Sequence, residues 1–295
     1  MARTLRWTSI ACGTLLGLGI VAYALVYVLS QRLLDRRYPV PVAVLTIPTD
    51  PQSIDEGRRL ATLHGCLHDC HGPAGEGRVM FDDPKIARIV APNLTAAVQR
   101  YTDSQLAAII RNGVRPDGRS VVVMPAEAFV VMTDADISHV IGYLRSLPPL
   151  PGPGPHVALG PLGRIGVVAG KFKTAAQRIA ESVPPPPAAT PGEEPGRYVA
   201  RTVCAECHGT DLHGDANPEF TSPDLAVVTA YTPEAFTRLL RTGVALGERQ
   251  VGIMSEQARN NLSQLTDAEI SALYGYLHGL SGGTRRLSAD GVPRQ

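Results

Sequence analysis

The sequence predicts an all-α protein, in which an N-terminal transmembrane helix precedes two tandem copies of one small helical domain. Three observations lead to this fold class. An apolar run of 22 residues occupies positions 8–29 near the start of the chain. Residues 52–150 and 193–281 contain the same motifs in the same order, and neither stretch shows strand-like alternation. A chain of 295 residues is long enough for two such domains.

Composition and charge exclude some classes of protein. The formal net charge is +1, so no basic field argues for binding to nucleic acid. Aromatic residues make up 5% of the chain, which suggests a core filled by something besides aromatic side chains. A disulfide framework would need more cysteines, more widely scattered along the chain. Four of the five cysteines instead form two close pairs, and a histidine directly follows each pair: Cys66 and Cys70, Cys204 and Cys207.

The apolar run allows two interpretations. At about 1.5 Å per residue it is long enough to cross a bilayer. A cleavable signal peptide could use Ala22-Tyr23-Ala24 as its cleavage site. The run continues through residues 25–29 beyond that site, which favours an uncleaved anchor over residues 1–37. Positive charges flank both ends of the run, so the charge rule leaves the orientation open.

The internal repeat aligns the two copies motif by motif. Each copy opens with a glycine-arginine pair and continues to its cysteine pair, a proline-containing loop and a threonine-capped helix that ends at glycine. A methionine lies eleven residues beyond each of these glycines, and a closing helix follows. The matching residues are Gly57 and Gly196, Pro92 and Pro223, Thr102 and Thr232, Gly113 and Gly243, Met124 and Met254.

Two proline-rich stretches, 148–155 and 183–196, separate the copies and are predicted to be extended connectors. Between them, apolar residues recur every three or four positions over 161–182, which predicts one helix. The expected division is an anchor over 1–37, a first domain over 50–150 and a proline-rich linker with a helix over 151–192. A second domain over 193–282 and a disordered tail over 283–295 complete the chain.

The cysteine pairs carry the most specific signal. Cys204-Ala205-Glu206-Cys207-His208 is a complete C-x-x-C-H, the attachment signature of c-type haem. Two thiols one helical turn apart can reach the two vinyl groups on one haem edge, and the adjacent histidine can bind the iron. In Cys66-Leu67-His68-Asp69-Cys70-His71 the spacer has three residues. Either the extra residue bulges and both thioethers form, which we favour, or Cys70 alone attaches. We therefore expect two covalently bound haem c groups.

Zinc binding and thiol redox chemistry are the alternatives to haem. Zinc needs two further ligands near each cysteine pair, and His213 alone does not complete a set. A redox-active dithiol would be expected within a βαβ unit, and no such pattern surrounds either pair. Haem attachment explains both the spacing and the histidines.

Further residues are candidates for completing each haem site. A thioether ligand on the far face of a haem raises its potential, and Met124 and Met254 lie 53 and 46 residues after His71 and His208. Met132 has no counterpart in the second copy and fits a core role. The carbonyls of Pro92 and Pro223 are candidates to accept the histidine N–H, although a simple turn before a helix is the alternative. Arg111 and Arg241 are candidates to pair with haem propionates, or to be ordinary charges at helix C-termini.

Taken together, these motifs resemble class I c-type cytochromes. More narrowly, they resemble the membrane-anchored di-haem cytochromes related to cytochrome subunits of periplasmic alcohol dehydrogenases. The matching pieces are Ala91-Pro92-Asn93-Leu94-Thr95, Arg111-Asn112-Gly113-Val114, Met124-Pro125, Tyr143-Leu144-Arg145-Ser146-Leu147-Pro148-Pro149 and Cys204 to Gly209. The chain departs from the pattern in the longer first spacer and in Met254-Ser255, where the first copy has Met124-Pro125.

The resemblance implies a small helical fold around each haem and covalent attachment outside the cytoplasm. It also implies single-electron transfer from a dehydrogenase to a terminal acceptor, either an oxidase or another cytochrome. The expected location is a bacterial inner membrane, crossed once, with the haem domains on the periplasmic side.

Two other function classes stay open. A di-haem enzyme of the peroxidase type would need a vacant or exchangeable iron ligand, whereas His and Met would saturate both irons. A subunit of a larger respiratory oxidase or dehydrogenase complex would co-purify with a catalytic subunit. Dinucleotide fingerprints, phosphate loops and nucleophile elbows are absent from the sequence.

Overall fold

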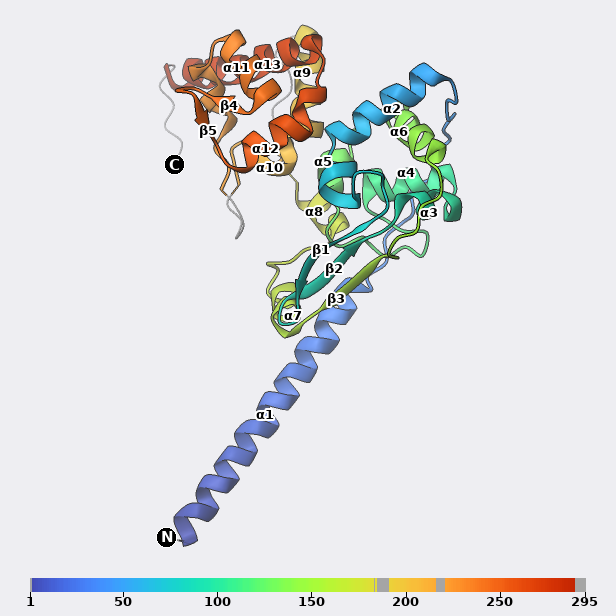
Figure 1. Cartoon of the computed structure of the whole chain (residues 1–295). Helices are drawn as coiled ribbons and strands as arrows, with labels where there is room; N and C mark the ends of the chain where they lie inside the picture. The colour runs from blue at the N-terminus through green and yellow to red at the C-terminus, as the bar shows by residue number, and fades with distance from the viewer. Residues whose placement is uncertain (1, 183, 185–190, 216–220, 290–295) are drawn as a thin grey trace.

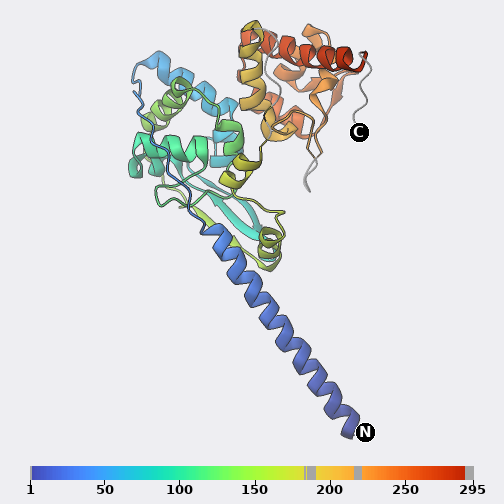
Figure 2. The ribbon, with the colours of Figure 1, turned by 180° about the vertical axis from the view of Figure 1, so that it is seen from behind.

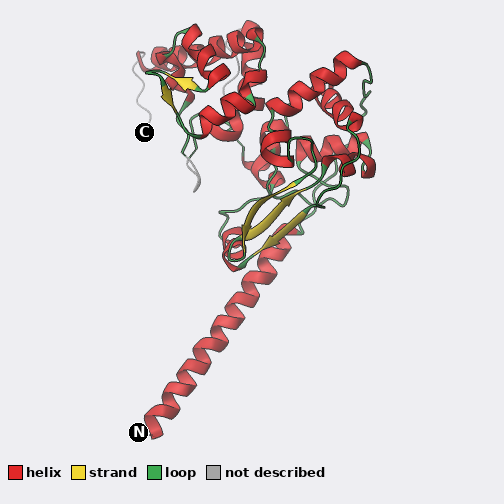
Figure 3. Cartoon of the chain, viewed as in Figure 1, coloured by secondary structure: helices red, strands yellow, loops and turns green. Residues whose placement is uncertain are grey.

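The computed structural model describes residues 2–182, 184, 191–215 and 221–289, and most of these residues are helical. A long helix, α1 (Ala2–Leu34), projects away from the rest of the protein (Figure 1). Two helical modules follow it, and the view from behind shows the C-terminal end of α1 beside the first module (Figure 2). The predicted helical class is confirmed in this broad sense, since the strands are few and short (Figure 3).

Helix α1 contains a stretch that is long and apolar enough to cross a membrane. This stretch, Arg6–Leu34, has 29 residues and a mean hydropathy of 2.1. Its large apolar side chains are exposed over most of its length, because no other element of the described chain packs against them there. These properties agree with both the anchor and the signal sequence considered above.

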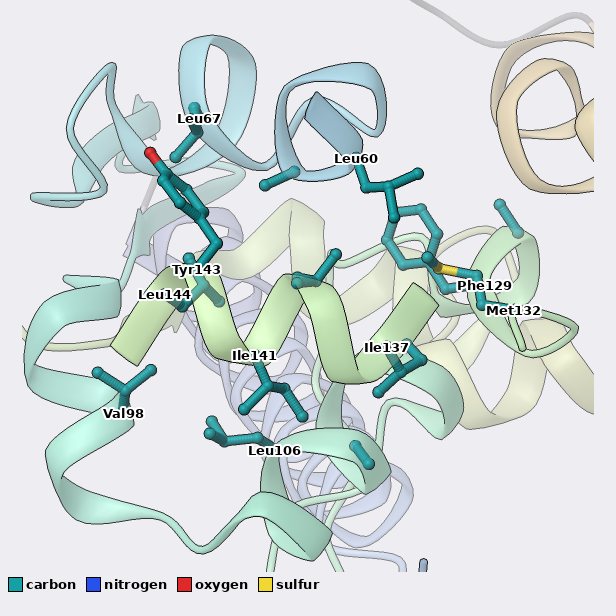
Figure 4. Close-up of a cluster of buried hydrophobic side chains, with 14 residues drawn as sticks. Leu60, Leu67, Val98, Leu106, Phe129, Met132, Ile137, Ile141, Tyr143 and Leu144 are labelled. Carbon is teal, nitrogen blue, oxygen red and sulfur yellow. The ribbon is translucent and has the colours of Figure 1, made fainter. Parts of the chain in front are cut away.

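The first module packs four helices and a short helical turn around one core. Helix α2 packs against α6, and Val98 of α3 and Leu106 of α4 lie on the opposite side of α6 from Leu60 of α2 (Figure 4). In Figure 4, Ile141 on α6 points towards Leu106, while Tyr143 points towards Leu67. Threonine side chains cap two of the helices and an aspartate caps α2, as expected for N-cap residues. The elements are α2 (Pro51–Leu63), α3 (Leu94–Arg100), α4 (Asp103–Asn112), α5 (Ala126–Phe129) and α6 (Asp134–Ser146).

The second module repeats this plan with its own core. Its crossing pair is α9 and α13, and Tyr276 on α13 is among its most deeply buried side chains. The elements are α9 (Glu194–Val199), η3 (Ala200–Cys204), α10 (Ala205–His208), η4 (Leu225–Ala230), α11 (Pro233–Thr242), α12 (Ile253–Asn260), η5 (Leu262–Gln264) and α13 (Asp267–Ala289), with η2 (Pro191–Glu193) before them. Helix α13 continues to Ala289, so the tail that was predicted to be disordered from residue 283 is helical up to that point. No proline interrupts the chain there before Pro293.

A glycine lets the helices of each crossing pair approach closely. A Cβ atom on Gly57 would lie 2.0 Å from the carbonyl oxygen of His139 on α6. A Cβ atom on Gly196 would lie 2.0 Å from the carbonyl oxygen of Ala272 on α13. No side chain fits in such a gap, because the opposing atoms belong to the backbone. The glycine of the glycine-arginine pair that opens each copy is therefore explained by packing between helices.

The structure contains strands that the sequence analysis did not predict. An antiparallel sheet has the order β1 (Arg78–Asp83), β2 (Ala87–Ala91), β3 (His156–Leu159), and a small hairpin pairs β4 (Val244–Ala245) with β5 (Arg249–Gln250). The prediction of helices and loops alone was wrong here. Strand β1 carries Arg78, Asp82 and Asp83, so it lacks an apolar alternation that would have identified it. Strand β3 pairs with β2 across more than sixty residues, a contact that no local pattern encodes.

The predicted linker is largely part of the first module. Its single predicted helix is divided into α7 (Pro161–Val168) and α8 (Ala175–Glu181), because Gly170 adopts a φ of 69° between them and ends the first. Helix α8 is held by Arg178, which lies 2.6 Å from Glu127 and donates to the carbonyl of Met124 at 2.6 Å. Of the second proline-rich stretch, residues 183 and 185–190 lie outside the described part of the chain.

The two modules touch through polar contacts and through Leu63. Arg59 on α2 lies 2.9 Å from Glu269 and donates to the carbonyl of Gln264 at 3.0 Å. His64 Nδ1 lies 3.1 Å from the carbonyl oxygen of Thr202. Leu63, at the end of α2, is buried within the core of the second module. The end of α2, directly before the first cysteine pair, therefore lies against the second module.

Candidate functional site

The two cysteine-histidine motifs form one helical turn in each module. The first motif is η1 (Cys66–His71), a π-helical turn that follows α2. The second begins at Cys204, the last residue of the π-helical η3, and continues through α10. A glycine with a positive φ follows each motif, 81° at Gly72 and 79° at Gly209. These glycines turn the chain away from the histidine, since such a φ is readily reached only without a Cβ atom.

The π-helical turn of η1 accommodates the extra residue of the first spacer. The N–H of Cys70 donates to the carbonyl of Gly65 at 3.2 Å, which is the i to i−5 pattern of a π-helix. One inserted residue widens this turn, so Cys66 and Cys70 still bracket a single turn of helix. The three-residue spacer is thus compatible with both cysteines facing one haem edge.

Each motif histidine is held by a proline carbonyl from the following loop. His71 Nδ1 lies 2.8 Å from the carbonyl oxygen of Pro92, and His208 Nδ1 lies 2.8 Å from that of Pro223. Burial lowers the pKa of both histidines, so each ring is neutral at physiological pH. A neutral ring that donates from Nδ1 presents the Nε2 lone pair, which is the form that a metal binds.

The loops that deliver these carbonyls are built alike. The N–H of Gly77 donates to the carbonyl of His71 at 2.7 Å, and the N–H of Gly214 donates to that of His208 at 2.8 Å. A Cβ atom on Gly77 would lie 2.7 Å from the backbone nitrogen of Asn93. The close approach of the two backbones fixes the loop against the motif. The repeat therefore extends from the sequence to individual hydrogen bonds.

The cysteines are partly buried, and none of them is bonded to another cysteine in the described chain. Burial raises the pKa of the Cys66, Cys70 and Cys204 thiols to about 12, and that of Cys207 to about 11. Thiols in such surroundings are poor thiolate ligands or redox nucleophiles. Within the described ranges, no group of three or more His, Cys, Asp or Glu side chains is arranged to hold a metal ion. The donor set of two thiols and one histidine fits covalent haem better than zinc.

Each candidate methionine lies on the same core as its own motif. Met124 packs on the first core together with Cys66. Met254 packs on the second core together with Cys204. Met132 is 5% exposed within the first core, in agreement with the core role expected for it. The placement is compatible with ligation by Met124 and Met254, and the ligation itself stays a prediction.

The two candidate arginines make the same protein contact in both modules. Arg111 at the end of α4 lies 2.8 Å from Asp134, the first residue of α6. Arg241 at the end of α11 lies 2.6 Å from Asp267, the first residue of α13. Each pair ties the end of one helix to the start of the closing helix. Contact with haem propionates stays a prediction, and these ion pairs give both arginines a structural role besides.

Sequence reasoning missed the residues that lie between the two motifs. Glu206, inside the second motif, has its pKa raised to about 7 by desolvation within the protein, with nearby Asp69 of the first motif adding to the effect. The carboxylate of Asp69 is hydrogen-bonded by Asn261 of the second module. The charge of Glu206 also contributes to the raised pKa of Cys66 and Cys70. The two motifs are therefore close neighbours, which no signal within either motif indicates.

Two modules of this kind, each with a Cys-Cys-His turn and a histidine held by a loop carbonyl, define a c-type haem protein. The family model for cytochrome c matches residues 54–148 and 193–281. The chain therefore belongs to the cytochrome c family, which implies covalently bound haem c and a role in electron transfer.

The chain is also similar to the fructose dehydrogenase cytochrome subunit of Gluconobacter japonicus. The two are 26% identical over 265 residues, which cover 78% of this chain and 54% of that protein. The chain thus spans about half the length of this curated relative.

Proposed function

We propose that this protein is a membrane-anchored, two-haem c-type cytochrome that passes single electrons from a dehydrogenase to an acceptor outside the cytoplasm. The observation that carries the proposal is the matched pair of contacts from His71 and His208 to proline carbonyls, both at 2.8 Å. One such contact is explained by a turn. Two such contacts, each at the histidine of its own cysteine motif, support two separate haem sites.

The cysteines and histidines are the residues that would hold the haems. Cys66, Cys70 and His71 would hold the first, and Cys204, Cys207 and His208 the second. Each bound haem supplies one-electron redox chemistry at its iron. The proline carbonyls hold the imidazole rings in one tautomer and one orientation, which increases their basicity towards a metal. His208 is buried and His71 is partly buried, which limits the access of water to that side.

Met124 and Met254 would fill the remaining axial positions. A thioether ligand favours ferrous over ferric iron and raises the potential. An iron with both axial positions filled transfers electrons without binding a substrate. This is the property that separates the carrier from a peroxidase-type enzyme.

Similarity to a dehydrogenase cytochrome subunit supports a dehydrogenase as the electron donor. An oxidase or a second cytochrome would take the electrons onward. The same similarity supports a place as a subunit of a larger dehydrogenase complex, and co-purification with a catalytic subunit would show it.

An uncleaved α1 would anchor the protein to a bacterial inner membrane, with both modules on the periplasmic side. Thiols and haem are joined on the oxidising side of a membrane, which supports this orientation. The C-terminal end of α1 also has partners in the folded protein, since Arg164 on α7 donates to Ser30 at 2.9 Å. A reporter that is active only in the cytoplasm should be inactive when fused after Gln295, and an active one would contradict this orientation.

Binding of external ligands tests the carrier proposal. Wild-type protein should bind neither carbon monoxide when reduced nor cyanide when oxidised. Met124→Ala and Met254→Ala should each open one haem to these ligands, and Met80→Ala, an exposed methionine on β1, should open none. The readout is the change in the visible spectrum, with the double variant opening both haems.

The outcomes of this test separate the candidate functions. Ligand binding by wild-type protein at either haem would contradict the carrier and favour the peroxidase-type enzyme. If Met124→Ala stays closed while Met132→Ala opens a haem, the axial assignment in the first module is wrong and the carrier proposal stands.

A further inference from the structure

Helix α7 and the tip of the β1–β2 hairpin form one surface beside the end of α1 (Figure 1). We call residues 84–86 and 161–173 the juxtamembrane surface. The N–H of Leu162 donates to the carbonyl of Lys85 at 2.9 Å, and the N–H of Gly160 donates to that of Ile86 at 2.9 Å. A Cβ atom on Gly163 would lie 2.1 Å from the carbonyl oxygen of Ile86, so helix and hairpin tip are in direct backbone contact. The two segments therefore act as one unit.

A single arginine ties this surface to α1. The guanidinium of Arg164 lies over the ring of Tyr27, 3.8 Å from its centroid. It also donates to Ser30 Oγ at 2.9 Å and to Gln31 Oε1 at 3.3 Å, and Ser30 is fully buried by the contact. The apolar run of α1 ends at Leu29. A helix needs about 20 residues to cross the hydrocarbon core of a bilayer. Arg164 therefore lies at the level where α1 would leave that core.

Apolar side chains are exposed at this level. On α7, Leu162 is 55% exposed, Ile165 48% and Val168 38%, and on the hairpin tip Ile86 is 43% exposed. The spacing of three along α7 places its residues on neighbouring positions of one side of the helix. Exposed large apolar residues that are continuous with a membrane-spanning segment are characteristic of an interfacial helix.

The charges around the surface suit an anionic partner. The chain has only three lysines, Lys85, Lys171 and Lys173, and all of them lie within the juxtamembrane surface. Two acidic groups are close: Asp83 accepts the N–H of Lys85, and Glu181 pairs with Lys173. Lysines that flank an interfacial helix reach the phosphate level of anionic lipids while their aliphatic stems stay in apolar surroundings.

We propose that the juxtamembrane surface docks onto the headgroup region of the bilayer that α1 crosses. Leu162, Ile165, Val168 and Ile86 insert between the lipids, and the lysines meet the lipid phosphates. This inference rests on the anchoring role proposed for α1. Docking at a second point besides α1 fixes the tilt of the first module, and with it the height of the first haem above the membrane. The second module stays away from the bilayer, at the far end of the molecule from α1 (Figure 2).

Spin labels on the full-length, haem-loaded protein test the proposal in vesicles that contain phosphatidylglycerol. The labels go on single cysteines introduced by Ile165→Cys, Leu16→Cys and Val227→Cys in a Cys12→Ala background. Leu16 lies within the apolar run, and Val227 is a matched apolar residue, 45% exposed, on the second module. Collision with oxygen reports lipid, and collision with a water-soluble nickel chelate reports water.

The label at position 165 should collide preferentially with oxygen, as the label at position 16 does, and the label at 227 should show the reverse. If position 16 lies in lipid while position 165 behaves like 227, the anchor stands and the docking proposal is wrong. Shielding of position 165 from both reagents would mean that protein covers it, either a second copy or a partner, and would also overturn the proposal. A water-facing label at position 16 would overturn the anchor and the docking together.

Discussion

The two modules hold their histidines in the same way but differ in the spacer between the cysteines and in the loop that follows the motif. Both place Nδ1 at 2.8 Å from a proline carbonyl, and both cross their outer helices at a glycine. The first module spans its motif with a π-helical turn, whereas the second uses the shorter C-x-x-C-H. The comparison shows which features the site requires. The length of the spacer can vary if a π-helical turn accommodates the added residue. The hydrogen bond from the histidine to the proline carbonyl is the same in both modules.

The loops between the motif and the proline also differ in length. Gly77 and Pro92 are 15 residues apart, whereas Gly214 and Pro223 are 9 apart. In the first module the longer loop forms the β1–β2 hairpin, whose tip packs against α7 beside α1. The hairpin that faces the proposed membrane therefore belongs to the longer loop of the first module.

Removing the cysteines of one module at a time should have the largest effect. Replacing Cys66 and Cys70 by Ala should lose one haem per chain, and replacing Cys204 and Cys207 should lose the other. Cys66→Ala alone should retain haem through Cys70 with a red-shifted α-band, because one vinyl group then stays unsaturated. Pyridine haemochrome spectra give both the count and the shift. An unchanged band would mean that Cys66 was never bonded and that the π-helical turn does not serve attachment.

The pH dependence of His64 tests the contact between the modules. Burial lowers the pKa of His64 to about 4, against an ordinary value of 6.5. The folded state therefore favours the neutral ring. The stabilisation of the folded state by the neutral His64 ring is complete above pH 6.5 and is lost as the pH falls from 6.5 towards 4. The loss amounts to about 3 kcal/mol, at 1.36 kcal/mol per pKa unit.

Denaturant unfolding at a series of pH values measures this effect. Between pH 6.5 and 4, the wild-type free energy of unfolding should fall more steeply than that of His64→Leu. His213→Leu is the control, since His213 is exposed on the second module and bonds Asp224 at 2.8 Å. Equal slopes for wild type and His64→Leu would mean that His64 is solvated and that the modules are not packed together there.

The glycine crossings should be equally sensitive in both modules. Gly57→Ala and Gly196→Ala should each destabilise their own module by about 1–3 kcal/mol, because the added methyl group meets backbone that cannot move aside. Gly275→Ala, on α13 with no atom within 4 Å of its Cβ position, should be neutral or stabilising. Thermal unfolding of the three variants makes the comparison. A loss at only one of the two crossings would mean that the helices of the other module can separate at little cost.

The ion pair between the modules should contribute least. Arg59→Met removes a side chain that is 20% exposed and bonded to Glu269, and should cost about 1 kcal/mol or less. Arg58→Met is the matched control, since Arg58 is 63% exposed and pairs within its own helix. Denaturant titration of the two variants compares the losses. Identical values would show that the contact with Glu269 adds nothing.

The sequence allowed prediction of those features that occur in both copies of the repeat. The motif histidines, their prolines and the terminal glycines occur twice, so each copy supported the interpretation of the other. The strand pairing of β2 with β3 and the placement of Glu206 near Asp69 occur once and join distant segments. The linker was misjudged at one residue. The apolar stripe over 161–182 indicated a helix correctly, but it did not show that Gly170 would adopt a φ of 69° and end the first of two helices.

The mass of the denatured full-length protein tests the central claim most directly, because only covalent haem survives denaturation. The account predicts the mass of the chain plus two haem groups, and one group fewer for each double cysteine variant. One haem on the wild-type chain would contradict the equivalence of the two modules, and none would contradict the haem sites altogether.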